Sequence, residues 1–298
     1  MLVVVTTPTG HIGKAVARHV LDAGVEVRLL ARYPEKLSDL ADRGAEVWQG
    51  TLDDEKFVAR VTRGADALFW VTPPCYDSKD LKGIQIRIGR SAAEAIRTNR
   101  IARVVNISSV GAHLASGVGP ITGLHEIERI LDEAATNITH LRPGFFYENY
   151  LWQLDSICSS GSVYFPVAGS TRYPMIATRD IARIAADRLL DAAWTGFWVR
   201  ELHGAAEISF DQAAALISEA VGVKVVHVRV SPEQAADSMR TWGMSENAVE
   251  LMLELYQALD SGLLRPAEPR SPETTTPTTL LEFAREVLAP RIRETVAH

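Results

Sequence analysis

Short apolar runs and amphipathic blocks alternate along the first 144 positions of the chain. The chain opens with LVVVT at 2–6, a β-branched run typical of a buried strand. After a turn, mostly apolar positions recur at i, i+3, i+4, i+7 and i+8 from Ile12 until Gly24, which is the spacing of one helix face. The opening segment is therefore predicted to be a strand, a glycine turn and a helix.

The same unit repeats along the chain. Further strands are predicted at 25–30, 45–50, 65–71, 102–109 and 137–144, with helices at 34–43, 54–63, 83–98 and 125–135 between them. Near-continuous apolar strands are typical of a parallel sheet that is covered by helices on both faces. The pattern predicts an α/β fold of the Rossmann type, a doubly wound parallel sheet with strand order 3-2-1-4-5-6.

After residue 144 the pattern changes. Helices are predicted at 178–192, 209–221 and 278–288, strands at 196–202 and 225–230, and irregular helical structure at 232–265. The Pro/Thr-rich stretch 266–280 is predicted to be a surface loop. We expect residues 1–150 to form the dinucleotide-binding domain, with 176–202 returning to it, and 151–175 and 203–298 to form a smaller substrate lobe.

Composition and charge exclude several classes of function. The chain has 31 Lys and Arg against 37 Asp and Glu, a formal net charge of −6, and no basic block, so nucleic-acid binding is not expected. Two cysteines, Cys75 and Cys158, have neither disulfide-framework nor zinc-ligand spacing. The apolar stretches are shorter than the roughly 18 residues of a membrane span, and no basic leader opens the chain, so a cytoplasmic protein is expected.

The first turn has the composition of a pyrophosphate-binding loop. Glycine in this turn lets backbone N–H groups approach the pyrophosphate, which then lies at the positive end of the helix. Gly10 and Gly13 meet this need, while Thr7 stands where the usual pattern has its first glycine. The candidate cofactor-binding residues of the turn are Thr7, Pro8, Thr9, Gly10, His11, Ile12 and Gly13.

The end of the second strand indicates which nucleotide is bound. An acidic residue here would bind the ribose 2′-OH of NAD, whereas an arginine matches a 2′-phosphate. Arg32 stands at this position and Lys36 follows one helical turn later. The alternative is a solvated basic residue at a helix start. We predict NADP as the cofactor, with NADPH preferred over NADH.

At this point the sequence resembles a known family, the NmrA-like atypical short-chain dehydrogenases, which include NAD(P)H:quinone oxidoreductases and isoflavone-reductase-like proteins. The resemblance is carried by TPTGHIG, ARYPEK, NISSVGA, HEIERIL, ITHLRPGFFYENYL and TRDIARIAADRLL, in unbroken order over most of residues 1–200. It implies a Rossmann fold and nicotinamide chemistry.

The Tyr-x-x-x-Lys pair of the wider dehydrogenase superfamily is missing. In that pair the lysine lowers the tyrosine pKa so that the phenol can exchange a proton with the substrate. None of the seven tyrosines has a lysine four positions later, no lysine occurs between Lys82 and Lys224, and Leu124 stands where relatives often carry it.

The other candidate site residues follow from the rule that ligands bind at the carboxyl ends of parallel strands. Thr72 and Pro73 follow the fourth strand, Ser108 and Ser109 the fifth, and Pro143 and Gly144 the sixth. The resemblance implies that Ser108 borders the nicotinamide and that Pro143 and Gly144 contact its carboxamide. Turn or cap roles are the alternatives for these residue types. Ser109 is assigned to the substrate pocket.

Aromatic residues and histidines complete the candidate set. Phe145, Phe146 and Tyr150 are predicted to line an apolar pocket for a planar substrate, with core packing as the alternative. The proton-donor candidates are His113, His125 and Tyr147, against structural roles for all three.

Two functions from different classes remain open. The first is an NADPH-dependent oxidoreductase that reduces a small conjugated substrate, a quinone or an imine, without the Tyr-Lys pair. The second is a non-catalytic NAD(P)-binding sensor that acts through a protein partner. An isomerase or epimerase with retained NAD is a weaker alternative, because the resemblance implies that it would need the missing tyrosine. No motif of a hydrolase, kinase or metalloenzyme is present.

Overall fold

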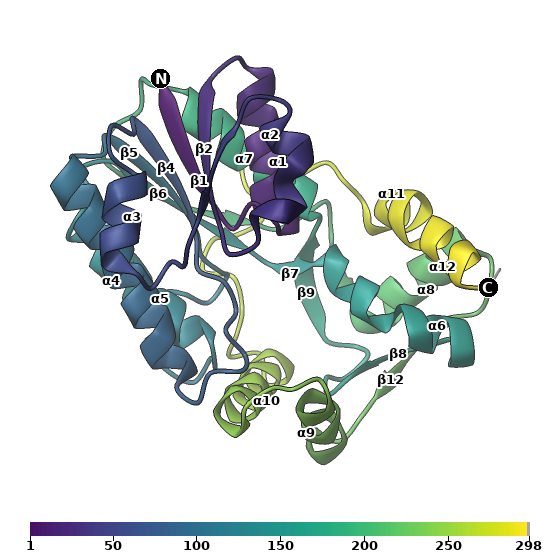
Figure 1. Cartoon of the computed structure of the whole chain (residues 1–298). Coiled ribbons are helices and arrows are strands. Elements are labelled where there is room, and N and C mark those ends of the chain that lie inside the picture. The colour runs from purple at the N-terminus through teal and green to yellow at the C-terminus, as the bar shows by residue number, and fades with distance from the viewer. Residues whose placement is uncertain (297–298) are drawn as a thin grey trace.

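The computed structural model describes residues 1–296 and contains a seven-stranded sheet in which every neighbouring pair of strands is parallel (Figure 1). The strand order is β10-β6-β5-β4-β1-β2-β3. The strands are β1 (Leu2–Thr6), β2 (Glu26–Ala31), β3 (Glu46–Gln49), β4 (Ala67–Val71), β5 (Arg103–Ile107), β6 (Ile138–Pro143) and β10 (Phe197–Leu202). The predicted Rossmann-type order is confirmed, and β10 extends it beyond β6.

Helices cover both faces of this sheet (Figure 1). One face carries α1 (His11–Asp22) and α7 (Thr178–Leu190), and the other carries α3 (Glu55–Val61), α4 (Leu81–Asn99) and α5 (Ile121–Asp132). Alternate residues of each strand face opposite layers, so that Val3 and Val5 pack with α1 and α7 while Val4 packs with α3 and α4. This alternation explains why the strands are apolar throughout.

Two of the predicted helices between the strands of this sheet differ from the structure. The helix predicted at 34–43 is a 3-10 turn, η1 (Pro34–Leu37), followed by a short α2 (Ser38–Ala41), because Leu37 leaves the helical region at φ −120°. α5 begins four residues earlier than predicted. Gly123 lies within this helix despite its low helix propensity, and its missing side chain leaves room for α4, since a Cβ atom there would lie 1.9 Å from Gln85 Oε1.

The remaining elements surround a second hydrophobic core. This core is centred on aromatic rings, with Phe145 in edge-on contact with Tyr150, Phe165 and Phe210. Its sheets have the orders β11-β9-β7 and β12-β8. The elements are β7 (Phe145–Phe146), η2 (Tyr147–Gln153), α6 (Leu154–Ser160), β8 (Ser162–Phe165), β9 (Arg172–Ile176), β11 (Glu207–Ser209), α8 (Phe210–Val221), β12 (Val226–Arg229), α9 (Pro232–Thr241), α10 (Glu246–Asp260), α11 (Leu280–Phe283), η3 (Ala284–Leu288) and α12 (Ala289–Val296).

The last helix runs further than the predicted 278–288. A π-helical turn over Ala284–Leu288 connects α11 to α12, which continues to Val296. Pro290 lacks a backbone N–H and so predicts a helix end, but a π turn changes the local hydrogen-bond pattern and lets the helix continue.

The segment 266–280 is not the simple surface loop that its composition predicts. Its threonines alternate between buried and exposed positions, and Thr274, Thr276 and Thr278 are buried. Thr274 O accepts from His203 N at 2.8 Å, and the Thr278 hydroxyl donates to Asp180 at 2.8 Å. The segment therefore runs along the carboxyl end of β10 and the start of α7, where hydrogen-bond partners of the Thr274 and Thr278 hydroxyls compensate their burial.

Candidate functional site

The turn between β1 and α1 has the geometry of a dinucleotide-binding loop. Thr7 adopts the left-handed conformation at φ +49°, and its carbonyl accepts from Gly10 N at 3.0 Å. A Cβ atom on Gly13 would lie 2.4 Å from Thr7 O and 2.8 Å from Thr6 O. Only glycine at position 13 allows α1 to pack this closely on β1, which is the role of the third glycine in such loops.

Gly10 differs from Gly13 in that no packing contact requires it. A Cβ atom there would make an ordinary 3.5 Å contact with Thr7 O. Gly10 is the N-cap of α1, and among residues 1–296 no side chain caps this helix and no acidic residue lies in its first turn. The N-terminal amides of α1 are thus free to bind an anion, and the absence of a side chain at Gly10 leaves space for it.

The exposed end of β2 carries two cations around one aromatic ring. The Arg32 guanidinium lies 5.7 Å and the Lys36 ammonium 5.1 Å from the centre of the Tyr33 ring. Both side chains are exposed, and neither has a carboxylate within 4.0 Å in the described part of the chain. Gln49 Nε2 donates to Arg32 O at 3.3 Å and so anchors the backbone here. The pair therefore remains available for a phosphate.

Two buried hydroxyls lie at the adjoining strand ends. Thr72 Oγ1 and Ser108 Oγ are inaccessible to solvent and have no hydrogen-bond partner among residues 1–296. Thr72 directly follows β4, and Ser108 follows β5 with its N–H donating to Leu141 O at 2.7 Å. Buried hydroxyls without partners are rare in proteins, so these two fit a polar ligand at this edge of the sheet. The residues present therefore fit a dinucleotide.

Other predicted positions have local roles that account for their identity. A Cβ atom on Gly144 would lie 2.2 Å from Pro174 O, so the close passage of β9 requires glycine there. Pro143 O accepts from Val110 N at 3.0 Å. The Ser109 hydroxyl donates to Val110 O at 3.0 Å, and the Pro73 carbonyl lies 3.7 Å from Cys75 Sγ.

The structure places Tyr147 and Tyr150 in the packed core, 1% and 0% exposed. The Tyr147 hydroxyl donates to Thr278 O at 3.3 Å, and burial, with Asp180 nearby, raises the pKa of this phenol. Burial likewise raises the pKa of Tyr150, whose hydroxyl contacts Met175 Sδ at 3.8 Å. Both rings therefore lie in the core rather than in the wall of an open pocket.

The remaining aromatic and histidine candidates are more accessible. Phe145 is half-buried against the second core, and Phe146 is half-buried on the α1/α7 side of the sheet. His113 is exposed in the loop after β5. His125 is half-buried on α5, and its Nδ1 lies 2.8 Å from Ala112 O. Because a carbonyl only accepts, His125 Nδ1 carries the hydrogen, which leaves Nε2 free.

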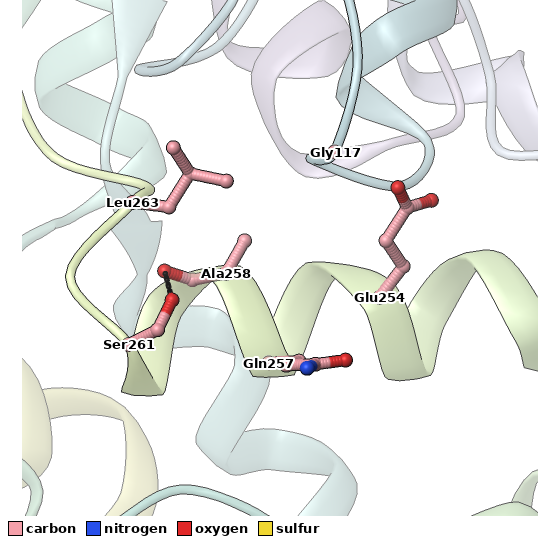
Figure 2. A pocket seen from close by; sticks show the side chains of 6 residues that line it. All are labelled: Gly117, Glu254, Gln257, Ala258, Ser261 and Leu263. Carbon is pink, nitrogen blue, oxygen red and sulfur yellow. Dashed lines mark hydrogen bonds between the residues drawn. The ribbon is translucent and has the colours of Figure 1, made fainter.

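A small pocket of about 240 Å³ lies between the loop after β5 and α10 (Figure 2). Gly117 borders it on one side, and Glu254 extends from α10 toward that loop. Ser261 closes the α10 end by donating to Ala258 O at 3.2 Å. This volume is below the usual range for small-molecule sites, and none of the predicted site residues lines the pocket.

Sequence reasoning missed a buried ion pair beside the site. Arg142 of β6 donates to Glu128 of α5 through two bonds of 2.9 and 2.5 Å. Burial opposes the charge on Arg142, but Glu128 more than compensates and raises the pKa of the guanidinium. The pair links α5, which carries His125, to the end of β6. The signal in the sequence is that β6 carries three polar residues, Thr139, His140 and Arg142, in an interior strand of the sheet.

Comparison with known proteins identifies the family to which this turn and these strand ends belong. The sequence profile of the NmrA-like family matches residues 1–283. The chain belongs to the NmrA-like family. The predicted family is thereby confirmed, together with the fold. A curated relative, the NAD(P)H azoreductase of Xenophilus azovorans, is 29% identical over 255 residues, which cover 86% of each protein.

Two further known proteins are similar to this chain. Quinone oxidoreductase 2 of Escherichia coli is 23% identical over 255 residues, covering 85% of this chain and 86% of that protein. The crystal structure of the Citrobacter sp. triphenylmethane reductase complexed with NADP(H) has a TM-score of 0.79 at 24% identity, covering 96% of this chain and 99% of that one. At this level of identity the structural likeness establishes the fold alone.

No helix within residues 1–296 has the length and hydropathy of a bilayer span. The same residues hold no group of three or more His, Cys, Asp or Glu side chains placed to bind a metal ion.

Proposed function

We propose that the chain is an NADPH-dependent reductase of a small conjugated acceptor of the quinone or imine class. The observation that carries this proposal is the line of binding groups along one edge of the sheet. The uncapped N-terminus of α1, the free cations of Arg32 and Lys36, and the unpartnered hydroxyls of Thr72 and Ser108 match the parts of NADPH from the pyrophosphate outward.

Each residue then has a defined task. Bound NADPH supplies the hydride. The α1 amides bind the pyrophosphate, Arg32 and Lys36 bind the 2′-phosphate, and Thr72 and Ser108 hold the nicotinamide end. The acceptor also needs one proton. His125 is suited to deliver it when its ring is doubly protonated: Nδ1–H stays bonded to Ala112 O and fixes the ring, Nε2–H transfers its proton, and solvent returns one afterwards.

The alternative proton donors are less suited. Tyr147 is buried with its hydroxyl bonded to Thr278 O, and its pKa is raised. His113 is exposed to solvent on the loop. The substrate class is supported by the names of relatives, an azoreductase and a quinone oxidoreductase, because azo compounds and quinones are both conjugated acceptors.

The charge reversal Arg32→Glu tests the cofactor assignment. NADPH and NADH affinities are measured by titration, and turnover by loss of the reduced nicotinamide absorbance with a panel of quinones and imines. We expect Arg32→Glu to weaken NADPH by at least tenfold more than NADH, since a charge-assisted bidentate pair is lost. Arg90→Glu, on the exposed side of α4, is the matched control and leaves both affinities unchanged. Equal losses for the two nucleotides in Arg32→Glu would contradict the assignment.

The same titration separates the second candidate function, a non-catalytic sensor that acts through a protein partner. The missing Tyr-x-x-x-Lys pair favours this alternative. Tight NADPH binding without oxidation by any acceptor supports the sensor, whereas acceptor-dependent oxidation supports the reductase.

A further inference from the structure

The loop after β4 connects the proposed cofactor site with α10. This segment, residues 72–80, is called the β4 loop below. It begins at Thr72, whose hydroxyl is buried without a partner in the described part of the chain. Burial raises the pKa of the Cys75 thiol, and the charge of Arg32 opposes this rise. The β4 loop therefore also lies near the proposed 2′-phosphate end.

Three hydrogen bonds tie the far end of the β4 loop to the start of α10. Ser245 N donates to Tyr76 O at 2.9 Å, and the Ser245 hydroxyl donates to Ser78 O at 2.5 Å. Asn247 Oδ1 accepts from Leu81 N at 2.9 Å, which satisfies one of the amides that the first turn of α4 leaves without a partner in the helix. Ser245 is also the N-cap of α10, so one residue both begins this helix and fixes it to the loop.

Apolar packing reinforces these hydrogen bonds. The Tyr76 side chain packs against a small hydrophobic cluster formed by α9 and α10. The buried members of this cluster are Ala235, Ala236, Met239, Val249 and Met252. Burial raises the pKa of the Tyr76 phenol, as expected for a ring enclosed by such a cluster. The β4 loop is thus held to α10 by its backbone and by a side chain.

α10 also contacts the loop after β5. A Cβ atom on Gly119 of that loop would lie 2.0 Å from Leu251 O, so the loop lies directly against the backbone of α10. α10 therefore contacts the loops that follow both β4 and β5, and it lies beyond the carboxyl ends of these strands (Figure 1). The acceptor must lie beside the nicotinamide, which is proposed to bind at the same strand ends. α10 is accordingly placed to form one wall of the acceptor site.

We propose that Ser245 and Asn247 are positioning residues that couple the cofactor site to the acceptor site. NADPH bound at Thr72 fixes the β4 loop, and the β4 loop then holds α10 in place against the acceptor. This inference rests on the proposed function, because it needs NADPH at Thr72 and an acceptor beside the nicotinamide. Neither Ser245 nor Asn247 acts on the reacting atoms, and each acts through the β4 loop. Since NADPH has already ordered the loop and α10, the acceptor binds with a smaller loss of conformational entropy.

Substitutions at the two positioning residues test the coupling. Asn247→Ala removes the tie to Leu81 with little risk to folding, because alanine is a better helix former than asparagine. Asn247→Asp is the conservative variant, since a carboxylate oxygen can still accept from Leu81 N. Ser245→Ala removes the tie to Ser78 together with the N-cap of α10. Ser231→Ala is its matched control, because it removes an N-cap serine from the neighbouring helix, α9.

The first readout is amide hydrogen exchange of residues 246–260, measured by mass spectrometry with and without saturating NADPH. In wild type, Asn247→Asp and Ser231→Ala, we expect NADPH to slow this exchange about threefold or more, although no residue of α10 is a proposed NADPH contact. Asn247→Ala and Ser245→Ala are expected to lose most of this effect. Unchanged exchange in wild type with NADPH bound, or the full effect in both Asn247→Ala and Ser245→Ala, would overturn the inference.

A fluorescence titration of NADPH on the same samples separates this result from the proposed function. If NADPH does not bind, the cofactor assignment fails and the inference fails with it. If NADPH binds without slowing the exchange of α10, the inference fails alone. Hydrogen exchange requires no turnover, so this readout is decisive even if no acceptor is reduced.

The second readout is the steady-state reduction of menadione, a quinone probe, at saturating NADPH. Asn247→Ala and Ser245→Ala are expected to raise the KM for menadione about threefold or more while the NADPH dissociation constant changes less than twofold, because the acceptor must then order α10 itself. Asn247→Asp and Ser231→Ala keep the wild-type KM. A wild-type KM in both Asn247→Ala and Ser245→Ala would show that the ties are purely structural and would refute the inference.

Discussion

Two glycines three residues apart in the first turn are expected to respond in opposite ways to alanine. At Gly13 a Cβ atom would lie 2.4 Å from Thr7 O, so α1 must move by about 1 Å before the contact reaches the ordinary 3.4 Å. Alanine gains about 1 kcal/mol of helix propensity over glycine, while overpacking this severe, against backbone that cannot rotate away, costs about 2–3 kcal/mol. We expect Gly13→Ala to destabilise the protein by about 1–2 kcal/mol, a fall in Tm of about 2–6 °C.

At Gly10 the same substitution meets only a 3.5 Å contact, at a φ of −87° that alanine adopts readily. The change of N-cap residue costs about 0.5–1 kcal/mol. The new methyl group, however, lies over the free amides of α1, where the pyrophosphate is proposed to bind. Gly10→Ala is therefore expected to keep nearly the wild-type Tm and to weaken NADPH by at least tenfold.

Thermal unfolding with and without saturating NADPH, together with a fluorescence titration, measures both effects on the same samples. A bound nucleotide stabilises the folded state by RT ln(1 + [L]/Kd), so a tenfold weaker affinity in Gly10→Ala should remove about 1.4 kcal/mol of the NADPH-dependent stabilisation. A wild-type Tm for Gly13→Ala would refute the packing argument. A wild-type NADPH affinity for Gly10→Ala would show that the pyrophosphate binds elsewhere.

Two further predictions concern strain and pH. Thr7→Gly should stabilise the protein by up to about 1 kcal/mol in urea unfolding, because a left-handed threonine is strained, and a net loss of stability would contradict that reading. Burial opposes ionisation of Glu201, but hydrogen bonds from His203 and from the N–H groups of Ala267 and Glu268 outweigh it and hold the pKa of the carboxyl below 4.5. A carboxyl whose pKa is lower in the folded than in the unfolded protein stabilises the fold at pH values above its unfolded pKa, and this stabilisation is lost as pH falls through its folded pKa. Glu201→Gln should therefore cost about 1.5–3 kcal/mol of unfolding free energy at pH 7. The difference in stability between Glu201→Gln and wild type should shrink below about pH 4.5. A pH-independent difference in urea unfolding would rule this out.

The strands and covering helices of the sheet could be predicted because each is determined by the pattern of its own residues. Each strand of the sheet is a short apolar run and each covering helix has one apolar face, so their positions are readable from the sequence to within a few residues. The errors fall where a distant contact decides the outcome. Gly123 provides room for the contact of α5 with Gln85 on another helix, and the threonines of 266–280 are buried against Asp180 and the backbone after β10, which accept from or donate to them.

The candidate site likewise has a part that the sequence predicts and a part that it does not. The turn at Gly10 and Gly13 and the cations at Arg32 and Lys36 stand in short motifs whose chemistry follows from residue type. The aromatic run after β6 has no such local rule. An aromatic residue is equally suited to a core and to a pocket, and only the packing of the second core shows that the rings of Tyr147 and Tyr150 are enclosed.

The pairing register of the strands brings together residues that no local sequence motif connects. Asn106 and His140 are 34 positions apart in sequence and become neighbours only because β5 and β6 pair in parallel with these residues in register. A shift of one residue would turn His140 toward the opposite face of the sheet and break its bonds to both Asn106 and Asp132. The polar residues of β6 are costly in a buried strand unless the register gives each a partner. Their presence at alternate positions, His140 and Arg142, is thus a signal that this face of the strand packs against polar partners, which are Asp132 and Glu128 of α5.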